Sequence, residues 1–445
     1  MKKLLYYPIF LVAVLFVGCA TDEETYISPS NTTQLEERLT ALYGNPDYLA
    51  IPASGSLNDI PNDPKNPISE AKVTLGKLLF HETGLANNPT KEIGRKTYSC
   101  ATCHHAGAGF QSGMKQGIGE GGFGFGSFGE ARVKSSDYLA TEIDIQPIRS
   151  PSILNTAYQD VMLWNGQFGG TKTNAGTEAH WTEGTPKATN NLGYEGLETQ
   201  AIAGMGVHRL ECDLDMLTDM GYKDYFDAAF PDVDESERYS ELYAGLAIAA
   251  YERTVVANEA PFQKWLDGNR TAMEDQEMKG ALLFFGKANC YSCHNGPGLN
   301  STTFHALGMN DLGGDDVYGE VDEATKKGRG GFTLDPNDDY KFKTPTLYNL
   351  KDVHFFGHGG SFGSIKEVIQ YKNNGIAEND AIPAANISAL FTPLGLSDEE
   401  VDQLTAFVEN ALYDPNLSRY MPESLPSGNC LTVADSKSKE DRGCN

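Results

Sequence analysis

The chain has 445 residues, of which 40% are hydrophobic, so it is long enough for two or three domains with substantial cores. Its 61 acidic residues outnumber 35 basic ones, which gives a formal net charge of −26 at pH 7. Because nucleic-acid binding needs a basic face, this balance argues against a nucleic-acid partner and leaves a solubilising acidic surface or a docking surface for a basic partner.

The first residues form a segment for export rather than for folding. Lys2 and Lys3 precede an apolar run that is too short for a typical transmembrane helix and suits the core of a signal peptide. The run ends in Phe16-Val-Gly-Cys19, which resembles a bacterial lipobox. Residues 1–18 are therefore predicted to be a lipoprotein signal peptide and Cys19 an acylated anchor; an ordinary cleaved signal with an incidental cysteine is the alternative. We expect an exported, lipid-anchored protein on the periplasmic side or in the cell envelope of a bacterium.

Two helices are predicted before the first cysteine motif. Residues 19–60 read as a polar tether and a short N-terminal helix, because Asn31 to Tyr43 has leucines at helical spacing after a start signal. A second helix is expected to start at Ser69 and to run to Phe80.

Two pentapeptides share the pattern C-x-x-C-H: Cys100-Ala-Thr-Cys103-His104 and Cys290-Tyr-Ser-Cys293-His294. The pattern is typical of c-type haem attachment, in which two thiols bind one porphyrin and the histidine binds its iron. A single motif would also fit a redox pair or half a zinc site, but two motifs that both end in His favour haem. We predict two covalently bound haem c groups, with His104 and His294 as iron ligands.

Long loops interrupt the helices. Residues 105–129 are rich in glycine and have no helical period, and a further polar insertion ends at Asn191. Apolar helices are predicted from Tyr239 to Val256 and from Asp275 to Phe285, and the capping box Ser397-x-x-Glu400 opens another.

The remaining cysteines lie outside the motifs. Cys430 and Cys444 lie in a polar stretch that we expect to be weakly structured, and they could close a disulfide in an oxidising compartment. Cys212 is expected to be a buried free thiol.

An apolar helix precedes each haem motif, so the chain repeats a unit. We predict a mainly α protein of two cytochrome c-like domains, each with one covalently bound c-type haem, with long Gly-rich loop insertions. Residues 61–238 would hold the N-terminal haem and residues 239–415 the C-terminal haem, followed by a tail at 416–445.

Further motifs accompany the haem motifs: Leu-Gly-Lys-Leu-Leu-Phe80, Arg149-Ser-Pro, Leu163-Trp164-Asn-Gly, Ala250-Tyr-Glu-Arg-Thr254, Lys343-Thr-Pro-Thr-Leu-Tyr-Asn349 and His358-Gly-Gly-Ser-Phe. Taken together, this set resembles the bacterial di-haem cytochrome c peroxidase family, which includes the MauG-type enzymes. The resemblance covers roughly Ser69 to Leu412, without the glycine-rich insertions.

The resemblance assigns a role to each haem. It implies that the haem on His104 is the peroxidatic centre, whose sixth position must open for peroxide. The haem on His294 would be the electron-entry centre. Trp164 matches a tryptophan between the haems, where it could mediate electron transfer; an ordinary packed tryptophan is the alternative. The loop after the first motif offers only His105, a poor distal ligand, so the first haem is expected to be open at rest.

The resemblance also implies a distal pair on the first haem. Gln200 matches a glutamine that stabilises the departing hydroxide, and Glu211 matches a glutamate that moves the peroxide proton. Glu211 lies one residue further from Gln200 than in the family pattern, and a solvated surface carboxylate is the alternative. His208 lies between them in sequence and is a rival distal group.

The sixth ligand of the second haem departs from the family pattern. The Met or Tyr of the family falls at Lys372, whose amine can bind haem iron once it has lost its proton. Tyr371, Met309 and a plain surface lysine at 372 are the alternatives. Methionine would favour a high potential, whereas lysine or tyrosine would favour the ferric state.

A calcium ion is the remaining cofactor that the resemblance implies. Asn155 matches the family's side-chain ligand, and Val353 and Phe355 match its backbone carbonyls. Oxygen ligands suit this hard cation. An asparagine that only stabilises a turn is the alternative.

These implications predict a di-haem c-type peroxidase. It would reduce hydrogen peroxide to water with electrons from a small donor protein such as a cytochrome c, passed from the C-terminal haem to the N-terminal haem. One alternative is a MauG-like oxidase that acts on a partner protein. The other is a non-catalytic di-haem electron-transfer protein, against which Gln200 and the block from Arg149 to Trp164 argue.

Overall fold

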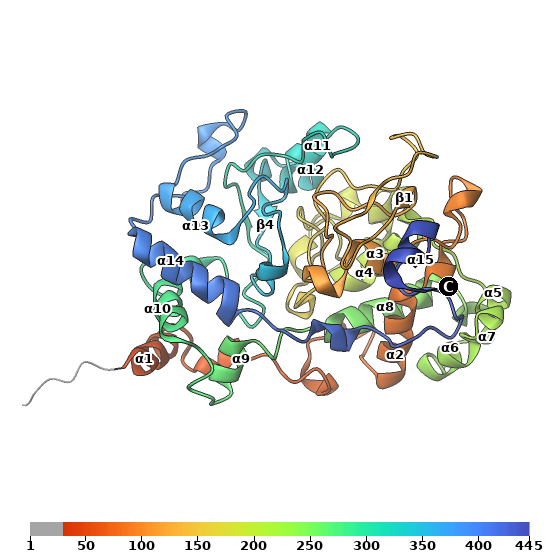
Figure 1. Ribbon diagram of the computed structural model, residues 1–445, viewed down its shortest axis with the longest axis horizontal. Helices are drawn as coiled ribbons and strands as arrows, with labels where there is room; N and C mark the ends of the chain where they lie inside the picture. The colour runs from red at the N-terminus through yellow and green to blue at the C-terminus, as the bar shows by residue number, and fades with distance from the viewer. Residues whose placement is uncertain (1–29, 445) are drawn as a thin grey trace, which may run out of the picture.

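Helices dominate the structure, a computed structural model that describes residues 30–444 (Figure 1). The predicted signal peptide and the anchor at Cys19 lie outside the described residues. The α-helices are α1 (Asn31–Tyr43), α2 (Glu70–His81), α3 (Cys100–Cys103), α4 (Gly196–Val207), α5 (Leu214–Asp219), α6 (Lys223–Ala229), α7 (Glu235–Arg238), α8 (Glu241–Thr254), α9 (Pro261–Leu266), α10 (Asp275–Phe284), α11 (Glu323–Lys326), α12 (Arg329–Thr333), α13 (Ile365–Asn374), α14 (Asp398–Ala406) and α15 (Ser436–Arg442).

The strands are short and form two antiparallel pairs. Strand β1 (Gly122–Phe123) pairs with β2 (Val133–Lys134), and β3 (Phe304–His305) pairs with β4 (Phe342–Lys343). A mainly helical protein was predicted, and the structure confirms it. Within residues 30–444, no helix combines the length and the hydrophobicity needed to cross a bilayer.

Helices α2, α4 and α8 pack closely around the first motif, because glycines stand at their crossings. A Cβ atom at Gly76 of α2 would lie 1.9 Å from the backbone oxygen of Ala247 in α8. A Cβ atom at Gly245 of α8 would lie 2.7 Å from the Cα of Ile202 in α4. Helix α8 therefore packs with the N-terminal helices, and we propose that the division between the two predicted units lies after Thr254 rather than at residue 238.

A glycine at a helix crossing also allows close packing among the C-terminal helices. A Cβ atom at Gly280 of α10 would lie 2.0 Å from the carbonyl oxygen of Gln403 in α14. Helix α14 begins with the predicted capping box of Ser397 and Glu400 and also packs against α13. Helix α1 lies against α10, so the N-terminal helix covers the C-terminal unit (Figure 1).

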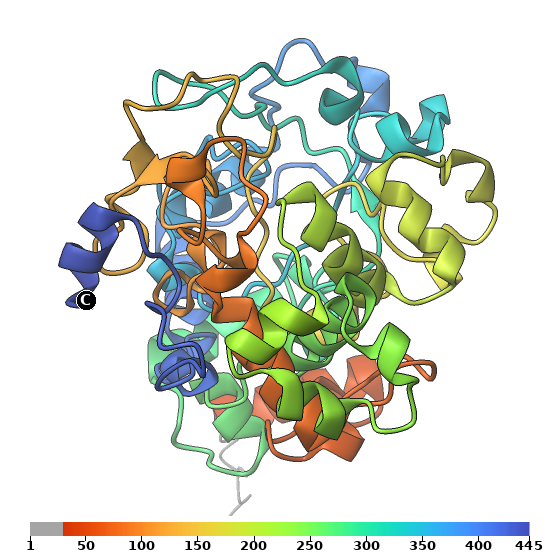
Figure 2. The same cartoon turned by 90° about the vertical axis from the view of Figure 1, so that its right-hand side faces the viewer.

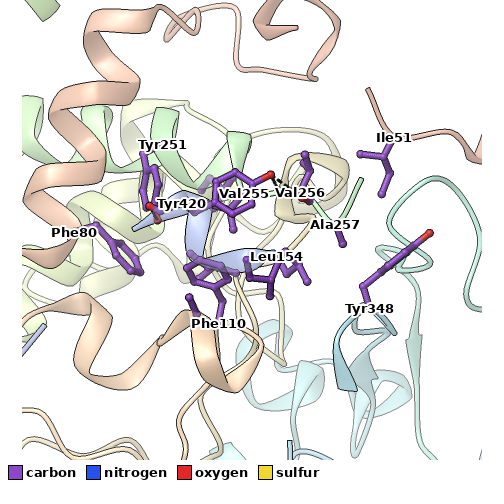
Figure 3. Packing of buried hydrophobic residues seen from close by; sticks show 14 of the residues in the cluster. Ile51, Phe80, Phe110, Leu154, Tyr251, Val255, Val256, Ala257, Tyr348 and Tyr420 are labelled. Carbon is purple, nitrogen blue, oxygen red and sulfur yellow. Dashed lines mark hydrogen bonds between the residues drawn. The ribbon is translucent and has the colours of Figure 1, made fainter. Parts of the chain in front are cut away.

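One continuous apolar core joins the two units. Phe80 and Tyr251 contribute from the N-terminal side and Tyr348 from the C-terminal side (Figure 3). Tyr420 lies between them and ties its hydroxyl to the backbone of Val256, to which it donates at 2.7 Å and from which it accepts at 3.1 Å. Because this core is shared, the two units hold a fixed relation to each other.

The C-terminal segment is ordered, which differs from the weakly structured tail that we predicted. The carbonyl of Thr432 accepts hydrogen bonds from the hydroxyls of Ser99 and Thr102 at 2.8 and 2.6 Å. The carboxylate of Asp441 in α15 accepts from the amides of Phe125 and Gly126. The segment thus straps the first haem motif and the glycine-rich loop beside it (Figure 2). We predicted a weakly structured tail because the segment is rich in polar residues. In the structure these residues bond to backbone groups of this loop instead of to water.

The cysteine predictions are confirmed. Cys430 and Cys444 form a disulfide that closes the end of the strap. Cys212 is a buried free thiol, with 6% of its surface exposed.

Candidate functional site

The first haem motif sits on the short helix α3. Ser99 and Thr102 form a capping box at its start, and His104 follows its last residue. The Nδ1 atom of His104 lies 3.3 Å from the carbonyl oxygen of Phe110. When Nδ1 donates to a carbonyl, the lone pair of Nε2 is left free to bind a metal.

The second motif repeats this arrangement. The Nδ1 atom of His294 lies 3.0 Å from the carbonyl oxygen of Leu299. Burial lowers the pKa of His104 and of His294 to about 4, so both rings are neutral at pH 7. The four cysteines of the two motifs are free thiols. Each motif therefore presents two thiols and one neutral, oriented imidazole, which fits covalently attached haem c.

A cavity of about 510 Å³ lies next to the second motif. Cys290, Cys293 and His294 form one wall. Its volume lies within the range of cofactor pockets in proteins. Trp164, Met309 and Lys372 are among the side chains on the other walls.

Lys372 of α13 faces this cavity rather than bulk water. Burial lowers the pKa of its amine to about 8, although the nearby thiols of Cys290 and Cys293 act in the opposite direction. Its Nζ atom also lies 5.8 Å from the centre of the Phe391 ring. Because Lys372 lines the cavity, its amine is positioned to reach a group bound there.

The other two ligand candidates are placed differently. The ring of Tyr371 is buried and donates its hydroxyl to the carbonyl of Leu307 at 2.5 Å, and it is not part of the cavity wall. Met309 does line the cavity. Of the three predicted ligand candidates, Lys372 and Met309 line the cavity and Tyr371 does not.

Trp164 is linked by contacts to the surroundings of both motifs. It lines the cavity of the second motif, and its indole N–H donates to the carbonyl of Arg149 at 2.7 Å. The guanidinium of Arg149 in turn donates to the carbonyl of Met114, in the loop that follows the first motif, at 3.0 Å. The Trp164 ring also meets His358 edge to face, at 6.4 Å between centres. This position is compatible with an aromatic ring between two haems.

Two buried cations line the same cavity, and sequence reasoning gave neither a role. Arg149 is 1% exposed, burial lowers its pKa to about 10, and its Nε atom has no hydrogen-bond partner in the described part of the chain. Burial lowers the pKa of Lys343 to about 7, and its amine donates to Gln159. Buried cations facing a cavity suit the carboxylates of a bound porphyrin. The signal was a charged residue at the start of each of two motifs, Arg149-Ser-Pro and Lys343-Thr-Pro.

The structure brings Gln200 and His208 together at the end of α4. A Cβ atom at Gly204 would lie 3.7 Å from the amide nitrogen of Gln200 and 4.0 Å from the His208 ring. The Nδ1 atom of His208 lies 2.8 Å from the carboxylate of Asp144. Burial is the main cause of the lowered pKa of His104, and the charge of His208 adds to it, so both imidazoles lie in one region.

Glu211 is placed apart from this group. Its backbone N–H donates to Leu85 at 2.9 Å, and its side chain is half-buried. The pKa of the exposed Arg95 is raised mainly by Glu92, with a smaller contribution from Glu211. In the part of the chain that the structure describes, no hydrogen bond joins Glu211 to Gln200 or His208.

Asn155 joins the two units. Its side-chain oxygen accepts the N–H of Ala257 at 3.0 Å, and its amide donates to Thr346 at 3.4 Å. Its backbone carbonyl accepts from the Asn300 side chain at 3.1 Å. These contacts make Asn155 a structural link, and calcium binding at this residue stays a prediction.

Known proteins resemble the whole of this arrangement. A family model described as di-haem cytochrome c peroxidase matches residues 70–271. The cytochrome-c peroxidase IdrP1 of Denitromonas iodatirespirans is 30% identical over 385 residues, which cover 81% of this chain and 86% of the relative. The methylamine utilization protein MauG of Methylorubrum extorquens is 26% identical over 365 residues, covering 80% and 82%. A crystal structure of a MauG-like protein associated with microbial copper homeostasis has the same fold, with a TM-score of 0.58 at 24% identity, covering 84% and 96%.

Proposed function

Because the chain belongs to the di-haem cytochrome c peroxidase family, we propose that it reduces hydrogen peroxide to two waters with electrons from a small donor protein such as a cytochrome c. The observation that carries the proposal is the repeated geometry of the two motifs, each with two free thiols and an imidazole whose Nδ1 is held by a carbonyl. Each haem, when bound, supplies an iron that exchanges single electrons and, at an open position, binds peroxide.

The proposed functional residues have different roles at the two haem sites. His294 would hold the electron-entry haem and His104 the peroxidatic haem, with Trp164 on the path between them. The side-chain amide of Gln200 would donate to the departing oxygen, which stabilises developing negative charge. The resemblance alone would assign the proton transfer to Glu211. The contacts within the site favour His208 instead.

Two haems per chain and two donor electrons per peroxide are the expected results for the purified holoprotein. The pyridine-haemochrome assay counts the haems, and oxidation of a reduced small cytochrome c measures the electrons. Cys293→Ser should impair attachment of the second haem and turnover with the donor. Cys212→Ser, which removes a thiol outside the motifs, should keep both haems. A count of one haem, or haem lost to acid–acetone extraction, would contradict the cofactor assignment. If the protein holds two haems but does not consume peroxide, it is an electron carrier instead of an enzyme.

A MauG-like oxidase that acts on a partner protein is the second candidate, and the cavity-facing amine of Lys372 favours it. An amine ligand stabilises ferric iron more than a thioether does, so oxidising equivalents would be stored more easily at the second site. Electrons from a high-potential cytochrome would then enter less readily. The ligand of the second haem therefore separates the two candidates.

Release from membranes is the expected result of Cys19→Ser, since we infer that the protein is exported and lipid-anchored at this residue. The disulfide between Cys430 and Cys444 supports export, because such bonds persist in oxidising compartments. Cell fractionation followed by immunoblotting measures the shift from the membrane to the soluble fraction, and Cys212→Ser serves as the control that stays with the membranes. If Cys19→Ser also stays there, the anchor lies elsewhere in the chain.

A further inference from the structure

We propose that His208 and Asp144 form the proton-transfer pair of the first haem site, in which His208 carries the proton and Asp144 positions its ring. The proposal rests on the proposed peroxide reduction and names the groups that move the proton during it.

The backbone of His208 is held in a fixed place relative to the first motif. His208 ends α4, and its N–H donates to the carbonyl of Gly204 at 3.0 Å. Its own carbonyl accepts the hydroxyl of Tyr98 at 2.8 Å, and Tyr98 lies two residues before Cys100. The imidazole is therefore anchored from both the helix and the segment that leads into the motif.

The imidazole is only partly covered by protein. Its side chain has 36% of its surface exposed. Its Nδ1 atom is bonded to Asp144, and Nε2 has no hydrogen-bond partner among residues 30–444.

Asp144 is held by the glycine-rich loop that follows the first motif. Its backbone exchanges hydrogen bonds with Gly119 and Glu120, at 2.9 and 3.0 Å. A Cβ atom at residue 119 would lie 2.4 Å from the Asp144 carboxylate, so this close approach needs glycine. The carboxylate, only 6% exposed, accepts the Nδ1 proton of His208, so in the neutral imidazole the lone pair lies on Nε2.

The charges around the pair raise the basicity of the imidazole. Burial lowers the pKa of His208, but the charge and hydrogen bond of Asp144 outweigh burial and the opposing Arg209, so the pKa lies above its usual value. Burial raises the pKa of Asp144, and the charges of His208, Arg209 and Arg132 more than offset it, so this carboxyl is ionised at neutral pH.

The other groups that face the pair are Glu120, which pairs with Arg209 at 2.7 Å, the Tyr98 hydroxyl, the Cys103 thiol and His104. A base with a pKa near the working pH suits proton transfer.

The proposed step moves one proton between the two peroxide oxygens. With hydrogen peroxide bound at the haem that His104 would hold, Nε2 of His208 would accept a proton from one peroxide oxygen and return it to the other oxygen as the O–O bond breaks. This other oxygen leaves as water, aided by the amide of Gln200. Two electrons from the reduced donor and two protons from solvent complete the conversion of one hydrogen peroxide to two waters.

The test compares His208→Gln, Asp144→Asn and Glu211→Gln in holoprotein whose two haems have been counted. Stopped-flow absorbance gives the rate constant for the reaction with peroxide. We expect a loss of about 10²–10⁴-fold in His208→Gln, the range for removal of a general base. Asp144→Asn should give a smaller loss and shift the pH profile of this rate constant, because the ring keeps its place but loses its charged partner. His180→Gln is the control. His180 lies in the polar insertion that ends at Asn191, and this variant should react with peroxide at the rate of the wild type.

Cyanide binding to the ferric protein gives a readout that needs no turnover. Hydrogen cyanide must release its proton to a nearby base when the anion binds iron, so optical titration should show weaker binding in His208→Gln and Asp144→Asn. If the protein does not consume peroxide but these affinities still fall, the pair stands as a proton acceptor and the proposed function fails.

Two results would overturn the proposed roles of His208 and Asp144. One is a loss of rate and of cyanide affinity confined to Glu211→Gln. The other is a low-spin first haem that becomes high-spin in His208→Gln, because His208 would then bind the iron instead of moving a proton.

Discussion

Replacing Lys372 by methionine is expected to raise the reduction potential of the second haem, by on the order of 0.1 V within the ~0.8 V range that axial ligands control. The amine faces the same cavity as His294, and burial lowers its pKa to about 8, so little free energy is needed to remove its proton. A thioether favours ferrous iron more than an amine does. Spectroelectrochemical titration of the holoprotein measures the change.

Two variants of α13 are controls for this experiment. Lys366→Met removes an exposed lysine that pairs with Asp402, and Tyr371→Phe removes a hydroxyl that donates to the carbonyl of Leu307. Neither Lys366 nor Tyr371 lines the cavity, so both variants should leave the potential of the second haem unchanged. An unchanged spectrum in Lys372→Met would reject lysine ligation. A methionine–iron charge-transfer band in the wild type would assign the site to Met309 and favour the conventional peroxidase over the MauG-like oxidase.

Replacing Arg253 by methionine should destabilise the fold by about 3–5 kcal/mol, the usual result of removing one partner of a buried ion pair. Arg253 of α8 makes two hydrogen bonds to Glu198 of α4, at 2.7 and 2.9 Å, and both side chains are fully buried. The variant would leave the Glu198 charge without compensation. Burial already raises the pKa of neighbouring Glu252 to about 8, which shows how poorly this region accommodates a lone carboxylate. Urea unfolding of the haem-loaded protein measures the free energy.

A matched pair of variants separates charge from packing. Arg95→Met breaks an exposed pair with Glu92 and should change the unfolding free energy little. Adding Glu198→Met to Arg253→Met should recover much of the loss, because Glu195, the other carboxylate that pairs with Arg253, still pairs with Lys172. If the unfolding free energy of Arg253→Met lies within about 1 kcal/mol of the wild-type value, water reaches Glu198 and the pair is not buried in solution.

Features that depend on neighbouring residues were predictable. The haem motifs need only a fixed spacing of two thiols and an imidazole, and the structure shows the same local hydrogen bond in both. The helices from Asn31 to Tyr43 and after Ser69 begin and end close to the predicted residues, since caps and apolar period act within one or two turns. The disulfide pair was predictable because the remaining cysteines were few.

The placement of α8 and of the C-terminal strap was not predictable in this way. Glycines at helix crossings allow α8 to pack on α2 and α4, and a sequence pattern does not say which helix will approach a given glycine. The strap is polar, and whether polar groups bond to water or to a loop depends on what lies beside them once the chain has folded.

The sequence by itself determined the cofactor class, the two attachment sites and the family, because covalent haem attachment is written in contiguous residues. Only the tertiary structure decided which groups surround each haem site. Lys372 and Tyr371 are neighbours in sequence, but on a helix they point in directions about 100° apart, and one reaches the cavity while the other does not. Asp144 meets His208 from 64 residues away, because a glycine in an irregular loop leaves room for its carboxylate. Such contacts depend on the path of the chain in space, which no local pattern encodes.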